Sequence, residues 1–302
     1  MMENLDQKRD AILITGPTAS GKSALAVRLA AEHGGVVVNA DSMQVYDTLN
    51  VLTARPQPGE MGGIEHRLYG HVPAGATYST GDWLREAGAL LIELRARGKL
   101  PVFVGGTGLY FRALTGGLSD MPAIPDDIRE RVRARLAVEG AEALYRDLAE
   151  RDPETAARLM VGDGQRIVRA LEVIEATGKS ISAFQSMSGP AAIDPERAQK
   201  IVVLPDRAVL AARIDRRFGL MLKLGAVEEV RALLAQNLSP AMPVMKAIGV
   251  PQITAMLAGE MREAEVIERG AAATRQYAKR QMTWFRNQLD ESWRRIDPLA
   301  DT

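Results

Sequence analysis

The segment Ala11-Ile12-Leu13-Ile14-Thr15, followed directly by Gly16-Pro17-Thr18-Ala19-Ser20-Gly21-Lys22-Ser23, decides the fold. Its first five residues are a short apolar run, rich in β-branched side chains, that predicts a buried strand. The next eight match the pattern G-x-x-x-x-G-K-[ST], and residues 24–32 have the composition of a helix. Strand, glycine-framed loop and helix form the context in which this motif binds phosphate. We therefore predict a phosphate-binding loop (P-loop), of the kind found in nucleotide-binding and ATP-binding proteins, at residues 16–23.

The chemistry of this loop suits an oxyanion. Gly16 and Gly21 allow the backbone to turn its N–H groups inward, and the N-terminus of the following helix adds a partial positive charge. Lys22 supplies a mobile cation, and the hydroxyl of Ser23 can hold Mg²⁺. A tight structural turn before a buried helix is the alternative interpretation, but such a turn has no need of the lysine.

Composition excludes several classes of protein. The 302 residues carry 38 basic and 38 acidic side chains, so any binding to nucleic acid depends on local patches. The chain has no cysteine, which excludes disulfides and thiol catalysis, and its three histidines lack a metal-ligand spacing. Residues 1–10 lack the apolar core of a signal peptide, and no apolar run approaches the roughly 18–20 residues of a membrane span. We expect a soluble, cytoplasmic enzyme that does not contact a membrane.

A second strand and a third predict the rest of a parallel α/β core. Residues 36–40 form an apolar run, and Asp41 follows where this strand would end, at the edge where parallel sheets bind ligands. Residues 52–80 predict a long loop over that edge, and residues 82–98 predict a helix. Residues 100–104 predict a strand that runs into the glycine-rich turn Gly105-Gly106-Thr107-Gly108-Leu109-Tyr110.

The middle of the chain predicts helices alone. After a linker at residues 121–125, residues 126–185 have helical patterns throughout, and residues 201–205 return to a strand. We therefore predict an α/β fold, a P-loop-type parallel sheet flanked by helices, with an inserted all-helical domain. The expected parts are a core at 1–118, a helical insertion at 119–197 and a continued core with a basic helical region at 198–302.

Several side chains near the predicted edge have more than one interpretation. From its position alone, Asp41 suits a helix cap, a Mg²⁺ ligand through water or a general base. Thr107, between glycines, is first interpreted as a turn residue. Arg213, Arg216 and Arg217 follow the strand at 201–205 on a helix, where they suit either neutralisation of a leaving group or a solvated face.

The last predicted helix carries the clearest basic stripe of the chain. Between positions 269 and 289 there is no acidic residue, and the cations are Arg269, Arg275, Lys279, Arg280 and Arg286. Such a stripe is more often a solvated surface than a nucleic-acid site. The aromatic side chains of Tyr277, Trp284 and Phe285 among these cations favour contact with unstacked bases.

Five blocks of sequence follow one another over nearly the whole chain. They are residues 16–23, Ala40-Asp41-Ser42-Met43-Gln44-Val45-Tyr46, residues 105–110, Gln165-Arg166-Ile167-Val168-Arg169-Ala170-Leu171-Glu172, and Thr274-Arg275-Gln276-Tyr277-Ala278-Lys279-Arg280-Gln281-Met282-Thr283-Trp284-Phe285-Arg286. Together they resemble the tRNA dimethylallyltransferase (isopentenyltransferase) family. The combination is far more specific than the P-loop alone. The absence of a cysteine/histidine zinc finger is similar to the bacterial type of this family.

The resemblance implies a reaction. The family transfers the dimethylallyl group from dimethylallyl diphosphate to the exocyclic amine of the adenosine 3′-adjacent to the tRNA anticodon, and releases pyrophosphate. Asp41 would be the general base or hydrogen-bond acceptor for the amine, and the target base would leave the stack to reach it. Lys22, Arg213 and Thr107 are the other implied catalytic residues. The diphosphate-binding residues, with Mg²⁺ as cofactor on Ser23, are Gly16, Pro17, Thr18, Ala19, Ser20, Gly21, Lys22 and Ser23.

The resemblance also implies contacts with the tRNA anticodon stem-loop, which the helical insertion would clasp. We expect the protein to be a monomer. These contacts are Asp41, Ser42, Met43, Gln44, Thr107, Arg129, Gln165, Arg166, Ile167, Val168 and Arg169, to which the basic stripe adds Arg275 and Arg280. Two blocks depart from the family. Leu52-Thr53-Ala54-Arg55-Pro56 replaces Gly-Thr-Ala-Lys-Pro, so the role of that lysine passes to Arg55, and Ala247-Ile248-Gly249-Val250-Pro251 lacks the usual tyrosine.

Three alternatives stay open. An isopentenyltransferase for free adenine nucleotides shares the loop and the aspartate, but it has less use for the insertion and the basic tail. A small-molecule kinase would hold ATP in the loop and transfer a phosphoryl group. An RNA-binding or nucleotide-switch module would bind tRNA with strong salt dependence and carry out no chemistry.

Overall fold

The computed structural model describes residues 9–119, 121–186 and 189–297. Residues 1–8, most of the segment considered for a signal peptide, lie outside the described residues. The chain divides into two compact units. The first unit holds the segments up to Thr115 and from Ala192 onward, and the second unit is Gly116–Ala191. Each unit has a hydrophobic core of its own.

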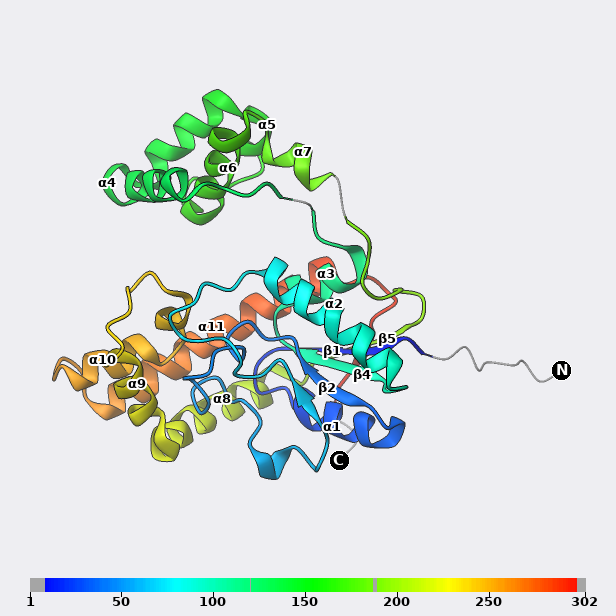
Figure 1. Ribbon diagram of the computed structural model, residues 1–302. Coiled ribbons are helices and arrows are strands. Elements are labelled where there is room, and N and C mark those ends of the chain that lie inside the picture. The colour runs from blue at the N-terminus through cyan, green and yellow to red at the C-terminus, as the bar shows by residue number, and fades with distance from the viewer. Residues whose placement is uncertain (1–8, 120, 187–188, 298–302) are drawn as a thin grey trace. The chain divides into compact units, whose positions relative to one another are not determined.

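The first unit is built on a parallel sheet (Figure 1), which confirms the predicted fold class. In the described residues the sheet has six strands in the order β3-β2-β4-β1-β5-β6, and each pairing is parallel. In the register, Ile14 lies opposite Val104 on one side and Ile201 on the other. The strands are β1 (Ala11–Thr15), β2 (Val36–Asn39), β3 (His66–Arg67), β4 (Pro101–Gly105), β5 (Ala198–Val203) and β6 (Arg294–Ile296).

Helices cover both faces of this sheet because its central strands are apolar on both sides. Ile12 and Ile14 pack with α1, whereas Leu13, between them, belongs to the larger cluster with α2, α3 and α11. The helices of this unit are α1 (Lys22–His33), α2 (Thr80–Ala96), α3 (Gly108–Gly116), α8 (Arg207–Met221), α9 (Val227–Leu234), α10 (Val250–Leu257) and α11 (Glu263–Gln288), with short helical turns at Pro58–Glu60, Leu222–Ala226 and Pro243–Lys246.

The end of β2 is fixed by an aromatic cluster. Trp83 of α2 is fully buried, and its Nε1 donates a hydrogen bond to the Asn39 carbonyl at 3.0 Å. Its ring stacks on Tyr110 of α3 with centroids 4.0 Å apart and meets the ring of Phe103 edge-on. The apolar periodicity of α2 therefore also positions the polar residues that follow β2.

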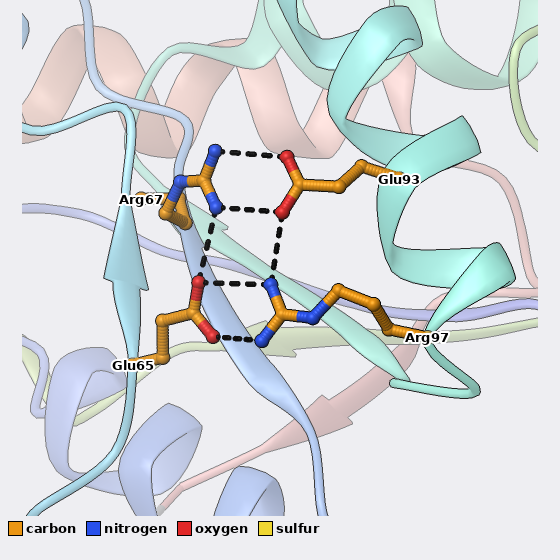
Figure 2. Close-up of polar contacts among 4 residues, drawn as sticks. All are labelled: Glu65, Arg67, Glu93 and Arg97. Atoms are coloured by element: carbon orange, nitrogen blue, oxygen red, sulfur yellow. Dashed lines mark hydrogen bonds and ion pairs between the residues drawn. The ribbon is translucent and has the colours of Figure 1, made fainter.

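The long loop predicted at residues 52–80 is interrupted by the short helical turn Pro58–Glu60 and by β3. This strand has two residues, too few for an alternating pattern to mark it. Figure 2 shows how its exposed side is tied to α2: Arg67 contacts Glu93 at 3.0 Å, and Arg97 contacts Glu65 at 2.7 Å, within one ring of ion pairs. These charges also discourage pairing with another strand at the sheet edge.

The second unit is helical. Its core contains Val132, Leu144, Leu148, Ile167 and Leu171, all fully buried. Its helices are α4 (Asp126–Arg151), which kinks at Gly140, α5 (Pro153–Ala156), α6 (Gly164–Thr177) and α7 (Ile181–Gln185). Among the described residues of the chain, no helix is both long and apolar enough to cross a membrane.

Candidate active site

The P-loop, Asp41 and the glycine-rich turn follow the carboxyl ends of three adjacent strands, β1, β2 and β4. Thr15, the last residue of β1, donates its hydroxyl hydrogen to the Gly105 carbonyl at the end of β4, at 3.1 Å. The chain places strands on both sides of β1, so this edge is also a topological switch point, where open α/β sheets bind ligands.

The P-loop has the tight backbone that its sequence predicts. Ala19 and Gly21 have positive φ angles of 63° and 89°, and α1 begins at Lys22. A Cβ atom at Gly16 would lie 2.6 Å from the Val203 carbonyl oxygen, so only glycine fits there. The Ser20 hydroxyl is buried within the loop without a hydrogen-bond partner among the described atoms. A buried polar atom of this kind is expected where a polar ligand completes the site.

Lys22 is partly enclosed by the loop. Its Nζ donates a hydrogen bond to the Pro17 carbonyl at 3.1 Å. Burial lowers the pKa of Lys22 to about 8, Asp41 opposes this shift by favouring the charged form, and Arg217 adds to it. Lys22 therefore lies within electrostatic reach of one carboxylate and one guanidinium.

Helix α8 brings two of its three candidate arginines to the loop. Arg213 donates a hydrogen bond to the Ala19 carbonyl at 3.4 Å. Arg217, which is half-buried, has its pKa lowered by burial, an effect that Glu60 opposes. Arg216 is exposed, as the alternative of a solvated helix face predicts. The helix therefore presents Arg213 and Arg217 to the loop one turn apart.

Asp41 is held in a turn of its own. The Asn39 side chain accepts a hydrogen bond from the Asp41 N–H at 2.9 Å and donates one to the Asp41 carbonyl at 3.0 Å. One carboxylate oxygen, Oδ1, accepts from the Met43 N–H at 3.0 Å. The other, Oδ2, is 3.5 Å from where a Cβ atom of Gly106 would stand. Asp41 therefore stabilises a turn rather than a helix, and Oδ2 is directed toward the glycine-rich turn.

Thr107 joins the two loops. Its Oγ1 accepts a hydrogen bond from the Ser42 N–H at 2.9 Å and donates one to the Ser42 hydroxyl at 3.3 Å. Its own N–H donates to the Ala40 carbonyl at 3.3 Å. The simple interpretation as a turn residue is thus incomplete, because this side chain also fixes the residue after Asp41.

Each glycine of the turn is required by a close neighbour. A Cβ atom at Gly105 would lie 2.0 Å from the Ala40 oxygen, one at Gly106 would lie 2.2 Å from Gln281 Nε2, and one at Gly108 would lie 2.3 Å from the Trp284 ring. Gln281 is a site residue that the sequence did not reveal, and Trp284, which the sequence suggested as a base-stacking side chain, packs against Gly108. Their spacing, with Tyr277 four residues before Gln281, places all three on one face of α11 and was the available signal.

Three tyrosines lie within electrostatic reach of the Asp41 carboxylate. The pKa values of Tyr69, Tyr110 and Tyr277 are all raised, mainly by burial and next by the charge of Asp41. These phenols therefore stay neutral at physiological pH and add no charge beside the carboxylate.

Other side chains implied as tRNA contacts instead hold the fold together, through hydrogen bonds to the backbone or packing in the core. Gln44 Nε2 donates to the carbonyls of Thr53 and Ala54, at 2.9 and 3.1 Å, and Arg55 donates to the Tyr46 carbonyl at 3.1 Å. Arg55 therefore holds its own loop together. Met43 packs against the main core.

The basic stripe on α11 is partly neutralised. Arg275 forms an ion pair with Asp215 of α8, a partner that the sequence of the stripe does not reveal. Arg280 is exposed, and its guanidinium carbon lies 5.8 Å from the centroid of the Tyr277 ring.

In the second unit, the block at 165–169 has two kinds of side chain. Ile167 and Val168 are buried in the helical core, whereas Gln165 and Arg166 are exposed. Arg169 pairs at 3.4 Å with Glu172, and Arg129 pairs at 2.8 Å with Asp126. Among the described residues, no group of three or more His, Cys, Asp or Glu side chains could hold a metal ion.

Comparison with known proteins agrees with this geometry. The family model described as IPP transferase matches residues 44–288, and the model described as isopentenyl transferase matches residues 9–71. A tRNA dimethylallyltransferase of Rhizobium meliloti is 72% identical over 301 residues, which are 99% of each chain. One of Agrobacterium fabrum is 70% identical over 298 residues, 99% of this chain and 100% of that protein.

Solved structures show the same likeness. The full-length tRNA isopentenylpyrophosphate transferase of Bacillus halodurans is 32% identical, with a TM-score of 0.68 over 96% of this chain and 90% of that one. A eukaryotic dimethylallyltransferase acting on tRNA is 29% identical, with a TM-score of 0.77 over 91% of this chain and 69% of that one. Identity over almost the full length, together with a P-loop and an aspartate at one sheet edge, shows that the chain belongs to the tRNA dimethylallyltransferase family.

Proposed function

We propose that this protein transfers the dimethylallyl group of dimethylallyl diphosphate to the exocyclic amine of the adenosine that follows the tRNA anticodon on its 3′ side. The observation that carries the proposal is that Lys22 and Asp41 follow the carboxyl ends of strands at one edge of the sheet, near enough for the charge of Asp41 to favour the charged form of Lys22. A carboxylate and a diphosphate site at one sheet edge supply a base for the amine and a cradle for the leaving group.

The proposed reaction breaks one carbon–oxygen bond and forms one carbon–nitrogen bond. As the allylic carbon leaves the diphosphate, negative charge grows on the departing oxygen, where the P-loop N–H groups, Lys22, Arg213 and Arg217 stabilise it. The adenine nitrogen forms the new bond to the allylic carbon. Asp41 Oδ2 accepts the proton that the amine releases, and pyrophosphate is the second product.

The P-loop suits Mg²⁺ as a cofactor. Ser23 is exposed in the first turn of α1, where its hydroxyl is free to face the diphosphate oxygens, and Mg²⁺ prefers oxygen ligands of this kind. Ser23 would hold the ion together with the diphosphate, and the ion would supply positive charge to the leaving group.

Exposed polar side chains support tRNA binding. In the second unit these are Gln165 and Arg166, which are exposed. Arg129 and Arg169 of the same unit are also available, although each forms an ion pair with an acidic side chain. In the first unit Arg280 is exposed, and its guanidinium carbon lies 5.8 Å from the centroid of the Tyr277 ring. We expect a cytoplasmic monomer, and we assign no tRNA contact to the buried side chains of Ile167 and Val168.

The decisive experiment offers labelled dimethylallyl diphosphate and Mg²⁺ to the protein with a tRNA anticodon stem-loop and, in parallel, with free AMP. Label on the stem-loop alone is the expected result. Label on AMP alone would move the chain to the enzymes that act on free nucleotides. Label on neither, together with phosphoryl transfer from ATP, would favour a small-molecule kinase.

A further inference from the structure

A buried amide from the last helix lies between the P-loop and the glycine-rich turn. Gln281 of α11 is only 6% exposed. Its Oε1 accepts a hydrogen bond from the Thr18 N–H at 3.0 Å, and its Nε2 donates one to the Gly106 carbonyl at 2.9 Å. One side chain therefore joins two loops that are 263 and 175 residues away from it in the sequence.

The amide of Gln281 fits closely against Gly106, on the side that faces Asp41. A Cβ atom at Gly106 would stand 2.2 Å from Gln281 Nε2 and 3.5 Å from Asp41 Oδ2. The amide and the reactive carboxylate oxygen therefore border the same small space beside Gly106. Glycine at this position is what allows the amide to enter.

The helix that carries Gln281 is itself held against the loops. Ala278, one turn earlier, packs with Leu210 and Ile214 of α8, and Ala19 of the P-loop packs against the same cluster. Trp284, on the other side of Gln281, occupies the space over Gly108. These apolar contacts keep the backbone of α11 in place, so the amide is presented from a rigid support.

We propose that Gln281 is a positioning residue that fixes the direction of the Thr18 N–H in the P-loop and holds this loop in register with the turn beside Asp41. The inference rests on the proposed function, because the separation between diphosphate and base decides how readily the amine reaches the allylic carbon. An amide is suited to this role since it offers one acceptor and one donor, which the Thr18 N–H and the Gly106 carbonyl require.

Two substitutions separate the parts of this role. Gln281→Leu keeps an apolar stem of similar length and removes both hydrogen bonds. Gln281→Glu keeps an acceptor for the Thr18 N–H, but it places a second oxygen against the Gly106 carbonyl and a negative charge near Asp41. The matched control is Gln288→Leu, the same exchange at an exposed position at the end of the same helix.

The experiment measures the affinity for inorganic pyrophosphate, the kcat and KM of prenyl transfer, and the melting temperature. We expect both Gln281 variants to bind pyrophosphate about tenfold more weakly and to lose kcat by about 10- to 100-fold, as a displacement of roughly 1 Å produces. The KM for the tRNA stem-loop should not change, and Gln288→Leu should match the wild type in all three measurements.

A purely structural role would give a different result. Gln281 variants that melt at a lower temperature, but bind pyrophosphate and turn over like the wild type when folded, would overturn the proposal. If Gln281→Leu does not fold, the comparison uses Gln281→Glu, and failure of both to fold would likewise contradict a role in positioning. Pyrophosphate binding requires no prenyl transfer, so the two ideas can fail separately. A wild type without prenyl-transfer activity would refute the proposed function, whereas weaker pyrophosphate binding by its Gln281 variants would still support this inference.

Discussion

The depressed pKa of Lys22 makes diphosphate binding sensitive to mild alkali. The P-loop lowers this pKa from 10.5 to about 8, so the ammonium loses its proton in a range where an exposed lysine keeps it. If binding requires the charged form, the charged fraction falls from about nine-tenths at pH 7 to about one-tenth at pH 9, and the affinity falls about tenfold.

The matched variant is Lys22→Arg, because a guanidinium keeps its charge throughout this range. Pyrophosphate also titrates, so both proteins are measured by calorimetry in the same buffers, and the ratio of their affinities removes the contribution of the ligand. We expect the wild-type affinity to fall about tenfold relative to that of the variant between pH 7 and pH 9. A ratio that does not change with pH would refute the argument that burial sets the charge of Lys22.

The same shift has a consequence for stability. Between pH 8 and 10.5 the unfolded chain binds more protons at Lys22 than the folded chain does, so this residue makes stability rise with pH in that window. Below pH 8 the buried ammonium costs the fold about 1–3 kcal/mol, after allowance for its partial exposure. Lys22→Met should therefore melt at a higher temperature than the wild type at pH 7 while losing activity, which a thermal scan beside a turnover assay would show.

Four further outcomes are expected. Asp41→Ala should lower kcat by about 10²- to 10⁴-fold and leave the pyrophosphate affinity nearly intact, and turnover within a few-fold of wild type would contradict its role as a base. Gly108→Ala should lower the free energy of unfolding by ~1–3 kcal/mol because of Trp284, whereas Gly88→Ala, whose Cβ meets no atom within 4 Å, should not lower it. Arg280→Ala should reduce the salt dependence of stem-loop binding by about one phosphate contact, and an unchanged slope would make this arginine a solvated side chain. Because Arg97 and Arg67 lower the pKa of Glu65 to about 2, Glu65→Gln should destabilise the fold by up to ~1 kcal/mol at pH 7, and that difference from wild type should vanish as the pH falls from 4.5 toward 2.

The parts of the site that can be predicted from the sequence are those formed by residues close together in the chain. The P-loop depends on Gly16, Gly21 and Lys22, which are close in the chain, and Asp41 directly follows a buried strand. The parallel sheet follows in the same way from short apolar runs in β1, β2, β4 and β5, although β5 starts at Ala198, three residues before the run at 201–205 that predicted it. The roles proposed for individual residues stay predictions, because geometry alone does not test them.

What sequence could not predict depends on partners far along the chain. The ion pair between Arg275 and Asp215 spans 60 residues, and no pattern in the basic stripe reveals it. Strands β3 and β6, of two and three residues, are too short to show a period, and pairing with a neighbour forms each of them. The glycines of the 105–108 turn look alike in the sequence, yet their neighbours come from the residues after β2 and from α11.

The link between Thr18 and Gln281 has a consequence for the time at which this protein becomes competent during its synthesis. A ribosome makes the P-loop early, but the amide that completes its surroundings arrives 263 residues later. The central strand likewise waits for β5 before its second neighbour is present. Contacts so distant in the chain form slowly, and the incomplete sheet exposes unpaired edges in the meantime. A nascent chain that ends before α11 should therefore hold the anion-binding sequence without a finished pocket, so that substrate capture begins only after α11 has been made.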